Sequence, residues 1–292
     1  MIRCTILGSN GYIGRHIADF LHKMGCSVFC YDLQPLGYFN YTQVDLCKRA
    51  ELSKINLDVD YIYVFAGITG TYRGFDDYEK YVSVNEIGLL NLLDAIRQSE
   101  FRPHIVYPSS RLVYKGCEDL LDEDAKKETR TIYAVNKLAC EGYLKAYSQS
   151  FNITYSIFRI CVPFGNLLSD DYSFGTVGFF INQARNRGEI TLYEGGYIRR
   201  TFTSINDVCY QIIKASQHPK GRNSIFNVGG NQYSLYEVAC TIASEFKAKV
   251  STIPYPPNEK LIESGSTCFD AAKIENLLNI TDYEPIESLF KK

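Results

Sequence analysis

The chain has 292 residues, of which 31 are Lys or Arg and 33 are Asp or Glu, so its formal net charge is -2. Hydrophobic residues make up 46% and charged residues 22%, which excludes disorder as a description of the whole chain. Because there is no basic excess, broad binding to nucleic acid is not expected.

Cysteine and histidine spacing bears on metals and on the compartment. The ten cysteines contain no CxxC pair, and the four histidines show no HxxH or HExxH spacing, so no metal is expected. No apolar run reaches the roughly 18 residues of a membrane span. Met1 runs directly into an apolar segment rather than a signal peptide. We therefore expect a soluble cytoplasmic protein with reduced thiols and no membrane partner.

Short apolar runs alternate with helical patterns through the first half of the chain. The expected strands are 2–7, 27–31, 61–66, 104–107 and 154–160. The expected helices are 12–23, 78–98 and 132–148. This repetition predicts an α/β fold of the Rossmann type, with a doubly wound parallel sheet and right-handed crossovers.

After Gly165 the pattern loosens. The further expected elements are helices near 179–187 and 204–216, a strand at 224–228 and an extended Pro-rich segment at 250–258. We expect a Rossmann domain at 1–165, with a return segment at about 201–228. Residues 166–200 and 229–292 are expected to form a small C-terminal cap that binds substrate.

A glycine-rich loop, Gly8-Ser9-Asn10-Gly11-Tyr12-Ile13-Gly14, lies between the first strand and the first helix. Gly8 permits a tight turn, Gly11 a close approach to a pyrophosphate, and Gly14 close packing of the helix on the strand. The helix N-terminus offers free N–H groups to phosphates. With a strand before it and a helix after it, the loop predicts dinucleotide binding.

An acidic residue, Asp32, follows the second strand, 18 residues after Gly14. A carboxylate at this place can accept both ribose hydroxyls of an adenosine and repels a 2′-phosphate. Asp32 therefore favours NAD over NADP, although an ordinary turn-forming Asp is the alternative.

A tyrosine and a lysine, Tyr133 and Lys137, stand at i and i+4 on one helix face. An ammonium nearby favours phenolate, so we expect the pKa of Tyr133 to fall from about 10 toward neutral pH. Ser110 follows the strand at 104–107, at the sheet edge where ligands bind in open α/β folds. These three residues are the candidate catalytic group for proton transfer.

In combination, these motifs resemble the extended short-chain dehydrogenase/reductases, specifically their NAD-dependent nucleotide-sugar epimerase/dehydratase branch. The resemblance covers nearly the whole chain, in the same order and spacing. The matching segments are the glycine loop, Asp45-Leu46, Phe65-Ala66-Gly67, Asn85 before the long helix, Ser109-Ser110-Arg111-Leu112-Val113-Tyr114, Tyr133-x-x-x-Lys137 with Glu141, Arg200 to Val208, Phe226 to Gly230, and Asp270 to Ile274.

The resemblance implies hydride chemistry at a sugar carbon. Tyr133 would exchange a proton with the reacting oxygen, Lys137 would hold the nicotinamide ribose and tune Tyr133, and Ser110 would orient the oxygen. Arg200 would face the nucleotide diphosphate, beside Ser110 as a substrate residue. The implied NAD-binding residues are Gly8, Asn10, Gly11, Tyr12, Ile13, Gly14, Asp32, Asp45, Leu46, Phe65, Ala66, Gly67, Asn85, Tyr133 and Lys137.

Three departures from the family pattern narrow the reaction and bear on the substrate. Arg111 and Leu112 stand where dehydratases of this branch carry Asp-Glu, which disfavours a 4,6-dehydratase and, to a lesser degree, a decarboxylase. Val162 replaces an Asn. Residues 263–266 (Glu-Ser-Gly-Ser) stand where the family carries a late Arg-Pro-Gly-Asp element. In the family, the residues at position 162 and at 263–266 usually contact the nucleotide diphosphate.

Two enzymatic functions remain open from the sequence. The leading one is an NAD-dependent nucleotide-sugar epimerase that removes and returns hydride at a sugar carbon, C4 by expectation. The alternative is a nucleotide-linked 4-keto-sugar reductase using NAD(P)H, and a minor alternative is a non-catalytic dinucleotide sensor. By resemblance, a homodimer is expected through the helices at 78–98 and 132–148.

Overall fold

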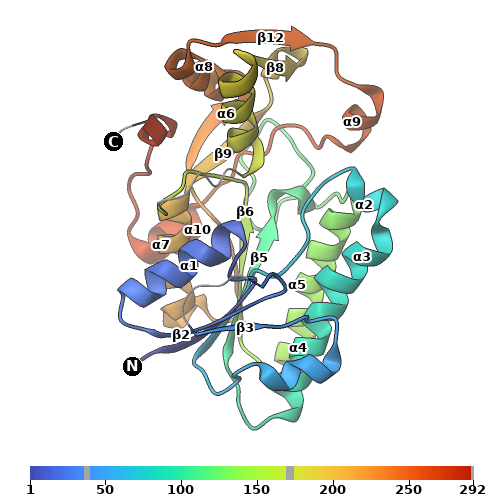
Figure 1. Cartoon of the computed structure of the whole chain (residues 1–292), viewed down its shortest axis with the longest axis vertical. Helices are drawn as coiled ribbons and strands as arrows, with labels where there is room; N and C mark the ends of the chain where they lie inside the picture. Colours follow the sequence, from blue (N-terminus) through green and yellow to red (C-terminus); the bar gives the residue numbers. More distant parts are fainter. Residues whose placement is uncertain (36–39, 169–173, 291–292) are drawn as a thin grey trace. The chain divides into compact units, whose positions relative to one another are not determined.

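A parallel sheet organises the first of two units in the computed structural model, which describes residues 1–35, 40–168 and 174–290 (Figure 1). Its order over the described residues is β10-β6-β5-β4-β1-β2-β3. The strands are β1 (Arg3–Leu7), β2 (Ser27–Asp32), β3 (Tyr41–Gln43), β4 (Tyr61–Val64), β5 (His104–Ser110), β6 (Tyr155–Ile160) and β10 (Ser224–Asn227). The expected α/β fold of the Rossmann type is confirmed.

Strand β1 is the switch point of this sheet. It pairs in parallel with β2 on one side and with β4 on the other, and β4 pairs in parallel with β5. Because the strands are parallel, the segments that follow β1, β4 and β5 leave the sheet at one edge. In open α/β sheets, ligands bind at this carboxyl edge, next to the switch point.

Helices pack against the sheet, and apolar side chains of the helices and strands together form the core of the first unit. They include α1 (Tyr12–Lys23), α3 (Tyr78–Val82), α4 (Gly88–Gln98) and α5 (Ile132–Phe151). Helix α5 contacts α3, α4 and strand β5, and α3, α4 and α5 lie side by side in Figure 1. Leu92, Leu93 and Ile96 of α4 are fully buried in the same cluster as Ile62 and Ile105 of the strands. This burial holds α4 against the sheet.

The helix expected at 78–98 is interrupted in the structure. A π-helical segment, η2 (Ser83–Ile87), separates α3 from α4. A π-segment keeps the chain helical while shifting the side chains that follow it, and such segments are frequent at functional sites. Asn85 lies within η2 and is buried.

The second unit contains two small sheets. It comprises Tyr114–Arg130, Ile160–Gln211 and Asn227–Lys292, and the first comprises Met1–Val113, Thr131–Arg159 and Ile212–Phe226. Its sheets have the orders β11-β9-β7 and β12-β8 over the described residues. The strands are β7 (Val162–Phe164), β8 (Glu189–Tyr193), β9 (Arg199–Ser204), β11 (Asn231–Ser234) and β12 (Lys249–Ile253). Helices α6 (Gly175–Arg187) and α8 (Leu235–Phe246) pack on each other over these strands.

Several elements of the second half were absent from the expectations. The Pro-rich segment at 250–258 is extended only in part, because β12 ends at Ile253 and α9 begins at Pro257. Helix α7 (Ile205–Gln217) agrees with the helix expected at 204–216. Elements of either half of the chain that were not expected are η1 (Arg49–Lys54), α2 (Arg73–Asp76), η3 (Arg111–Val113), η4 (Glu194–Gly196), η5 (Pro219–Gly221), α9 (Pro257–Ile262), α10 (Ala272–Leu278) and η6 (Ile286–Phe290).

Candidate active site

The glycine loop turns tightly between β1 and α1. Gly8 has φ +84°, and a Cβ there would lie 2.3 Å from the backbone nitrogen of Ala66. A Cβ on Gly14 would lie 2.1 Å from the carbonyl oxygen of Gly8. Both positions therefore require glycine, one for its backbone angle as well as for space. The Gly11 N–H donates to the Gly8 carbonyl oxygen at 3.1 Å, which closes the turn.

The loop leads to a helix N-terminus suited to an anion. Gly11 is the N-cap of α1, no side chain caps the helix, and its first turn carries no acidic residue. Tyr12 and Ile13 begin the helix, and Tyr12 is buried. The first N–H groups and the positive end of the helix dipole are thus not neutralised by the loop's own side chains.

Asp32, at the end of β2, is tied to the same loop. Its Oδ2 accepts from the backbone N–H of Asn10 at 2.9 Å, and its Oδ1 accepts from that of Gln34 at 3.1 Å. These bonds fix the carboxylate at the carboxyl edge of the sheet. The oxygens keep further lone pairs for hydroxyl donors.

The segment after β4 reaches the glycine loop and η2. The N–H of Phe65 donates to the Leu7 carbonyl oxygen at 2.7 Å, and Ala66 lies under Gly8. A Cβ on Gly67 would lie 3.0 Å from Oδ1 of Asn85. The backbone of residues 65–67 therefore lies between the glycine loop and the Asn85 side chain and contacts both.

The Asn85 side chain bridges two elements. Its Oδ1 accepts from the Ile68 N–H at 2.8 Å, and its Nδ2 donates to the Ile68 carbonyl at 3.1 Å and to Asn136 Oδ1 at 3.3 Å. With these bonds made, Asn85 holds the segment after β4 against α5.

Asp45 and Leu46 follow β3 in the chain. Asp45 Oδ1 accepts from the N–H of Cys47 at 3.0 Å. The Leu46 carbonyl oxygen accepts from Nδ2 of Asn91 at 2.9 Å, and its side chain packs on the core cluster. The pair is thus held against α4.

Tyr133, Lys137 and Ser110 come together at the carboxyl end of β5. Ser110 is the last residue of that strand, and its hydroxyl lies close enough to Tyr133 to lower the pKa of the phenol. The Lys137 Nζ donates to the Pro108 carbonyl oxygen at 2.7 Å and lies 5.7 Å from the centroid of the Tyr133 ring. Thr131 caps α5 by accepting from the Ala134 N–H at 3.1 Å, which fixes where the helix, and so Tyr133, begins.

Burial dominates the titration of this group. It raises the pKa of Tyr133 above its usual value, while the hydrogen bond with Ser110 acts in the opposite direction. Burial lowers the pKa of Lys137 to about 8, opposed by Cys140 and Glu141. The pKa of Tyr133 therefore lies above its usual value rather than below it as expected, because desolvation of the phenolate outweighs the effect of Ser110.

Arg200, the expected diphosphate ligand, lies in the second unit within an ion pair. Its Nη2 is 2.8 Å from Oε2 of Glu263, and both side chains are largely buried. The Tyr255 hydroxyl donates to the same carboxylate oxygen at 3.1 Å. Arg200 and Tyr255 line a cavity of about 450 Å³, whose other lining residues include Phe179, Phe180, Tyr193, Leu235 and Ile253.

Comparison with known proteins places the chain in a family. Residues 4–229 match the model of the NAD dependent epimerase/dehydratase family. The chain belongs to this family. It is therefore an enzyme of the short-chain dehydrogenase/reductase type, as the sequence motifs indicate.

Relatives in this family match the chain over nearly its full length. The chain is 27% identical to a dTDP-L-rhamnose 4-epimerase of Burkholderia thailandensis, covering 98% of the chain and 92% of that protein. It is 24% identical to an uncharacterised UDP-glucose epimerase of Bacillus subtilis, covering 99% and 94%. The structure of a Thermus thermophilus UDP-glucose 4-epimerase in complex with NAD matches with a TM-score of 0.85 at 22% identity, covering 99% of each chain.

Pro108 and Arg159 of this site were not singled out by the motifs, and Glu141, which lies within one of them, was given no role. Pro108 contributes only a carbonyl oxygen, so its side chain carries no signal of its contact with Lys137. Ser109 donates to Glu141 Oε1 at 2.6 Å, and Glu141 pairs with Arg159. Glu141 stands four residues after Lys137, and that spacing was the available sequence signal.

The described parts of the chain also bear on membranes and metals. No helix there is long and apolar enough to cross a membrane. Among residues 1–35, 40–168 and 174–290, no group of three His, Cys, Asp or Glu side chains is arranged to hold a metal ion.

Proposed function

We propose that this enzyme is an NAD-dependent nucleotide-sugar epimerase that acts at a sugar carbon, C4 by preference. The observation that supports it most is the group of Ser110, Tyr133 and Lys137 at the carboxyl edge of the sheet, in which Ser110 and Lys137 are buried and Tyr133 is half-buried. The glycine loop leaves β1 at the same edge. A proton-transfer group and a dinucleotide loop at one edge are the parts that transient oxidation of an alcohol requires.

The chain's own residues fit NAD. The uncapped N-terminus of α1 suits the pyrophosphate, and Gly8 and Gly14 leave no room for side chains around the turn. Asp32 would accept the adenosine ribose hydroxyls and would repel the 2′-phosphate of NADP. The remaining residues proposed to contact NAD are Asn10, Gly11, Tyr12, Ile13, Asp45, Leu46, Phe65, Ala66, Gly67, Tyr133 and Lys137, with Asn85 positioning them.

Proton transfer at the sugar oxygen would fall to Tyr133. Bound NAD would supply the hydride acceptor and donor at the sugar carbon. Ser110 would hydrogen-bond the reacting oxygen, and Lys137, as an ammonium, would stabilise the phenolate whenever Tyr133 has lost its proton.

The second unit is proposed to bind the nucleotide of the substrate. Aromatic and aliphatic side chains line its cavity, together with one largely buried guanidinium, that of Arg200. Such a lining suits a planar base beside an anionic group. Part of the expected cap, residues 169–173, lies outside the described residues, so the sugar contacts expected from that segment stay a prediction.

A 4-keto-sugar reductase is the second candidate. Burial keeps Tyr133 as the neutral phenol, and a phenol is the proton donor that reduction of a ketone needs. The non-catalytic sensor is less well supported, because all three residues for proton transfer are present at the carboxyl end of β5.

One experiment separates these functions. The purified protein is denatured, its nicotinamide content is measured, and the native protein is incubated with UDP-, dTDP-, CDP- and GDP-sugars. We expect stoichiometric NAD, interconversion of one pair of epimers without net oxidation, and loss of this activity by about 10² or more in Tyr133→Phe. Consumption of added NAD(P)H by a keto sugar, with no bound cofactor, would establish the reductase instead.

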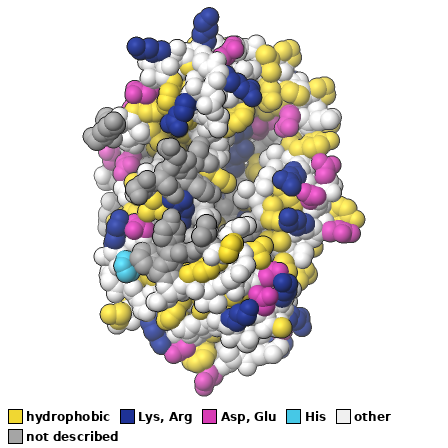
Figure 2. All heavy atoms as spheres, viewed as in Figure 1, with side chains coloured by type: hydrophobic (Ala, Val, Ile, Leu, Met, Phe, Trp, Pro, Cys, Tyr) yellow, Lys and Arg dark blue, Asp and Glu magenta, His cyan; other side chains and the backbone are white. Residues whose placement is uncertain are grey.

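We also propose that the protein forms a homodimer through α3, η2 and α5. Tyr78, Val82, Ile87 and Val135 on these elements are large apolar side chains that are 37–54% exposed. Figure 2 shows hydrophobic, basic and acidic side chains mixed on the visible part of the surface.

A cytoplasmic location is proposed as well, since the ten cysteines are free thiols.

A further inference from the structure

One face of α5 contacts three consecutive residues at the end of β5. The three helix residues are spaced by four, so they lie on one face at steps of about 6 Å. Lys137 Nζ donates to the Pro108 carbonyl at 2.7 Å, and Glu141 Oε1 accepts from the Ser109 hydroxyl at 2.6 Å. Tyr133 lies near the Ser110 hydroxyl, which lowers the pKa of the phenol.

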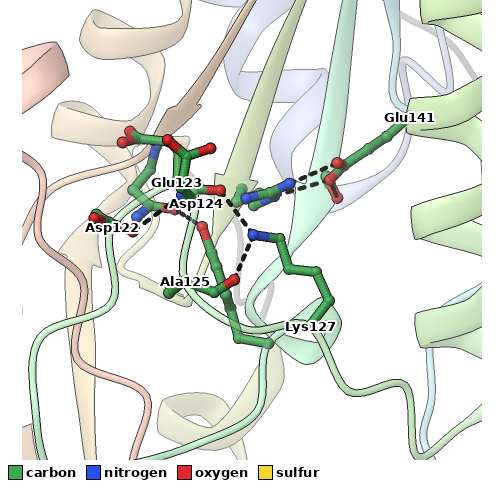
Figure 3. A network of polar contacts seen from close by, with 10 residues as sticks. Asp122, Glu123, Asp124, Ala125, Lys127 and Glu141 are labelled. Carbon is green, nitrogen blue, oxygen red and sulfur yellow. Dashed lines mark hydrogen bonds and ion pairs between the residues drawn. The ribbon is translucent and has the colours of Figure 1, made fainter.

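Glu141 is itself held by a buried ion pair with Arg159. Arg159 of β6 donates from Nε to Glu141 Oε1 at 2.9 Å and from Nη2 to Oε2 at 2.7 Å. Both side chains are 2% exposed. Figure 3 shows the two parallel contacts of the guanidinium with Glu141. A bidentate pair of this kind fixes the orientation of a carboxylate.

We propose that Glu141, oriented by Arg159, is a positioning residue for proton transfer by Tyr133. By accepting the Ser109 hydroxyl, it fixes the end of β5. The neighbours of Ser109 on either side then present a carbonyl to Lys137 and a hydroxyl to Tyr133. The proposal rests on the proposed function only in assigning proton transfer to Tyr133.

Stability alone is a weak reason for this ion pair. Buried pairs are often no more stabilising than well-packed apolar residues of the same size. The Glu141 carboxylate, in contrast, is placed to act on both the geometry and the charge of Lys137, one helical turn away. Removing the strand contact and removing the charge therefore have separable consequences.

The charge effect has a definite sign. The titratable groups around Lys137 are Tyr107 of β5, whose ring centroid lies 4.5 Å from Nζ, and Tyr133, Cys140 and Glu141 of α5. Glu141 raises the pKa of Lys137 against burial. The ammonium form is present below that pKa and is lost as the pH rises through it. Without the carboxylate, this loss moves to lower pH.

Two variants test the two effects. Ser109→Ala removes the strand contact and leaves the ion pair, and we expect kcat to fall about tenfold with little change in KM, as for a small misplacement of reacting groups. Glu141→Gln removes the charge, and we expect the alkaline limb of the pH–rate profile to move to lower pH. The pKa of Lys137 is measured directly from the pH dependence of its modification by acetic anhydride, followed by peptide mass spectrometry.

Ser156→Ala is the matched control on the same strand as Arg159. Ser156 is fully buried, and its hydroxyl lies 2.8 Å from His104 Nε2 and donates to the Gly221 carbonyl at 2.7 Å. This variant should lower Tm without changing kcat or the Lys137 modification profile.

The outcomes are distinguishable from failure of the proposed function. If Ser109→Ala and Glu141→Gln lower only Tm, as Ser156→Ala does, Glu141 stabilises the fold and the positioning role is wrong. If Glu141→Gln does not fold, Ser109→Ala decides. If the wild type converts no nucleotide sugar, the epimerase assignment fails, while the modification profile of Lys137 in Glu141→Gln still supports or overturns the positioning role.

Discussion

A single carboxylate, that of Glu263, limits how Arg200 can bind an anionic ligand. The segment 200–208 resembles its family pattern, but the Arg200 guanidinium is paired with Glu263 inside the cavity of the second unit. An anionic ligand must therefore share the guanidinium with a carboxylate or displace it. The sequence indicated this departure at 263–266, and only the structure shows that Glu263 contacts Arg200.

We predict that Glu263→Gln strengthens binding of UDP by about tenfold at low ionic strength. The amide keeps the shape of the side chain but removes its negative charge, so the Arg200 charge is no longer balanced. Calorimetric titration with UDP, and with uridine as the neutral ligand, measures the effect. Equal changes for UDP and uridine would contradict it.

The neighbouring pair of Arg199 and Glu237 provides the control. Its atoms are 3.2 Å apart, and its side chains are 44% and 51% exposed, so solvent screens the charge. Glu237→Gln should leave the binding of both ligands unchanged.

At the scale of elements, the junction of β1 with α1 carries the strictest requirement for its residues. A Cβ on Gly14 would lie 2.1 Å from the Gly8 carbonyl oxygen, so the loop and the helix would have to separate. We predict that Gly14→Ala lowers NAD affinity at least about tenfold, because the N–H groups at the start of α1 move away from the pyrophosphate. Equilibrium dialysis with NAD measures this.

Gly142 is a glycine with the opposite surroundings. It lies on α5, and a Cβ there would meet nothing within 4 Å. Gly142→Ala should keep NAD affinity and raise the free energy of unfolding by roughly 0.5–1 kcal/mol, the usual helix preference for Ala over Gly. An equal loss of NAD binding in both variants would show that the loop geometry is not the cause.

The sequence predicts some helices and strands correctly and misses others, and each outcome has a physical reason. The bounds of α1 agree with those expected, because a glycine before it and a clear apolar face make both ends visible. The π-segment at Ser83–Ile87 was missed, since one extra residue per turn hardly alters the apolar periodicity of 78–98. Strands β8, β9 and β11 were missed because they form small sheets set by tertiary contacts.

At the scale of the whole molecule, we predict that the exposed apolar side chains of α3 and η2 are buried in a homodimer. Val82 and Ile87 are 37% and 42% exposed. The double variant Val82→Asp, Ile87→Asp should therefore be monomeric, because it would place charges in an apolar interface. Sedimentation velocity on the wild type and the variant measures this.

Leu261 of α9 is the control for that variant. It is 75% exposed and belongs to the second unit. Leu261→Asp should leave the sedimentation coefficient of the wild type unchanged. A monomeric wild type would overturn the homodimer.

What the sequence determined by itself is the class of the fold and the identity of the local motifs. A glycine turn, a helical i, i+4 pair and a run of buried strands are local patterns, so spacing along the chain is enough to read them. Desolvation and long-range pairing are not local. Only the tertiary structure decided that burial raises the pKa of Tyr133, that Glu263 pairs with Arg200, and that Arg159 holds Glu141, because each depends on residues brought together by folding.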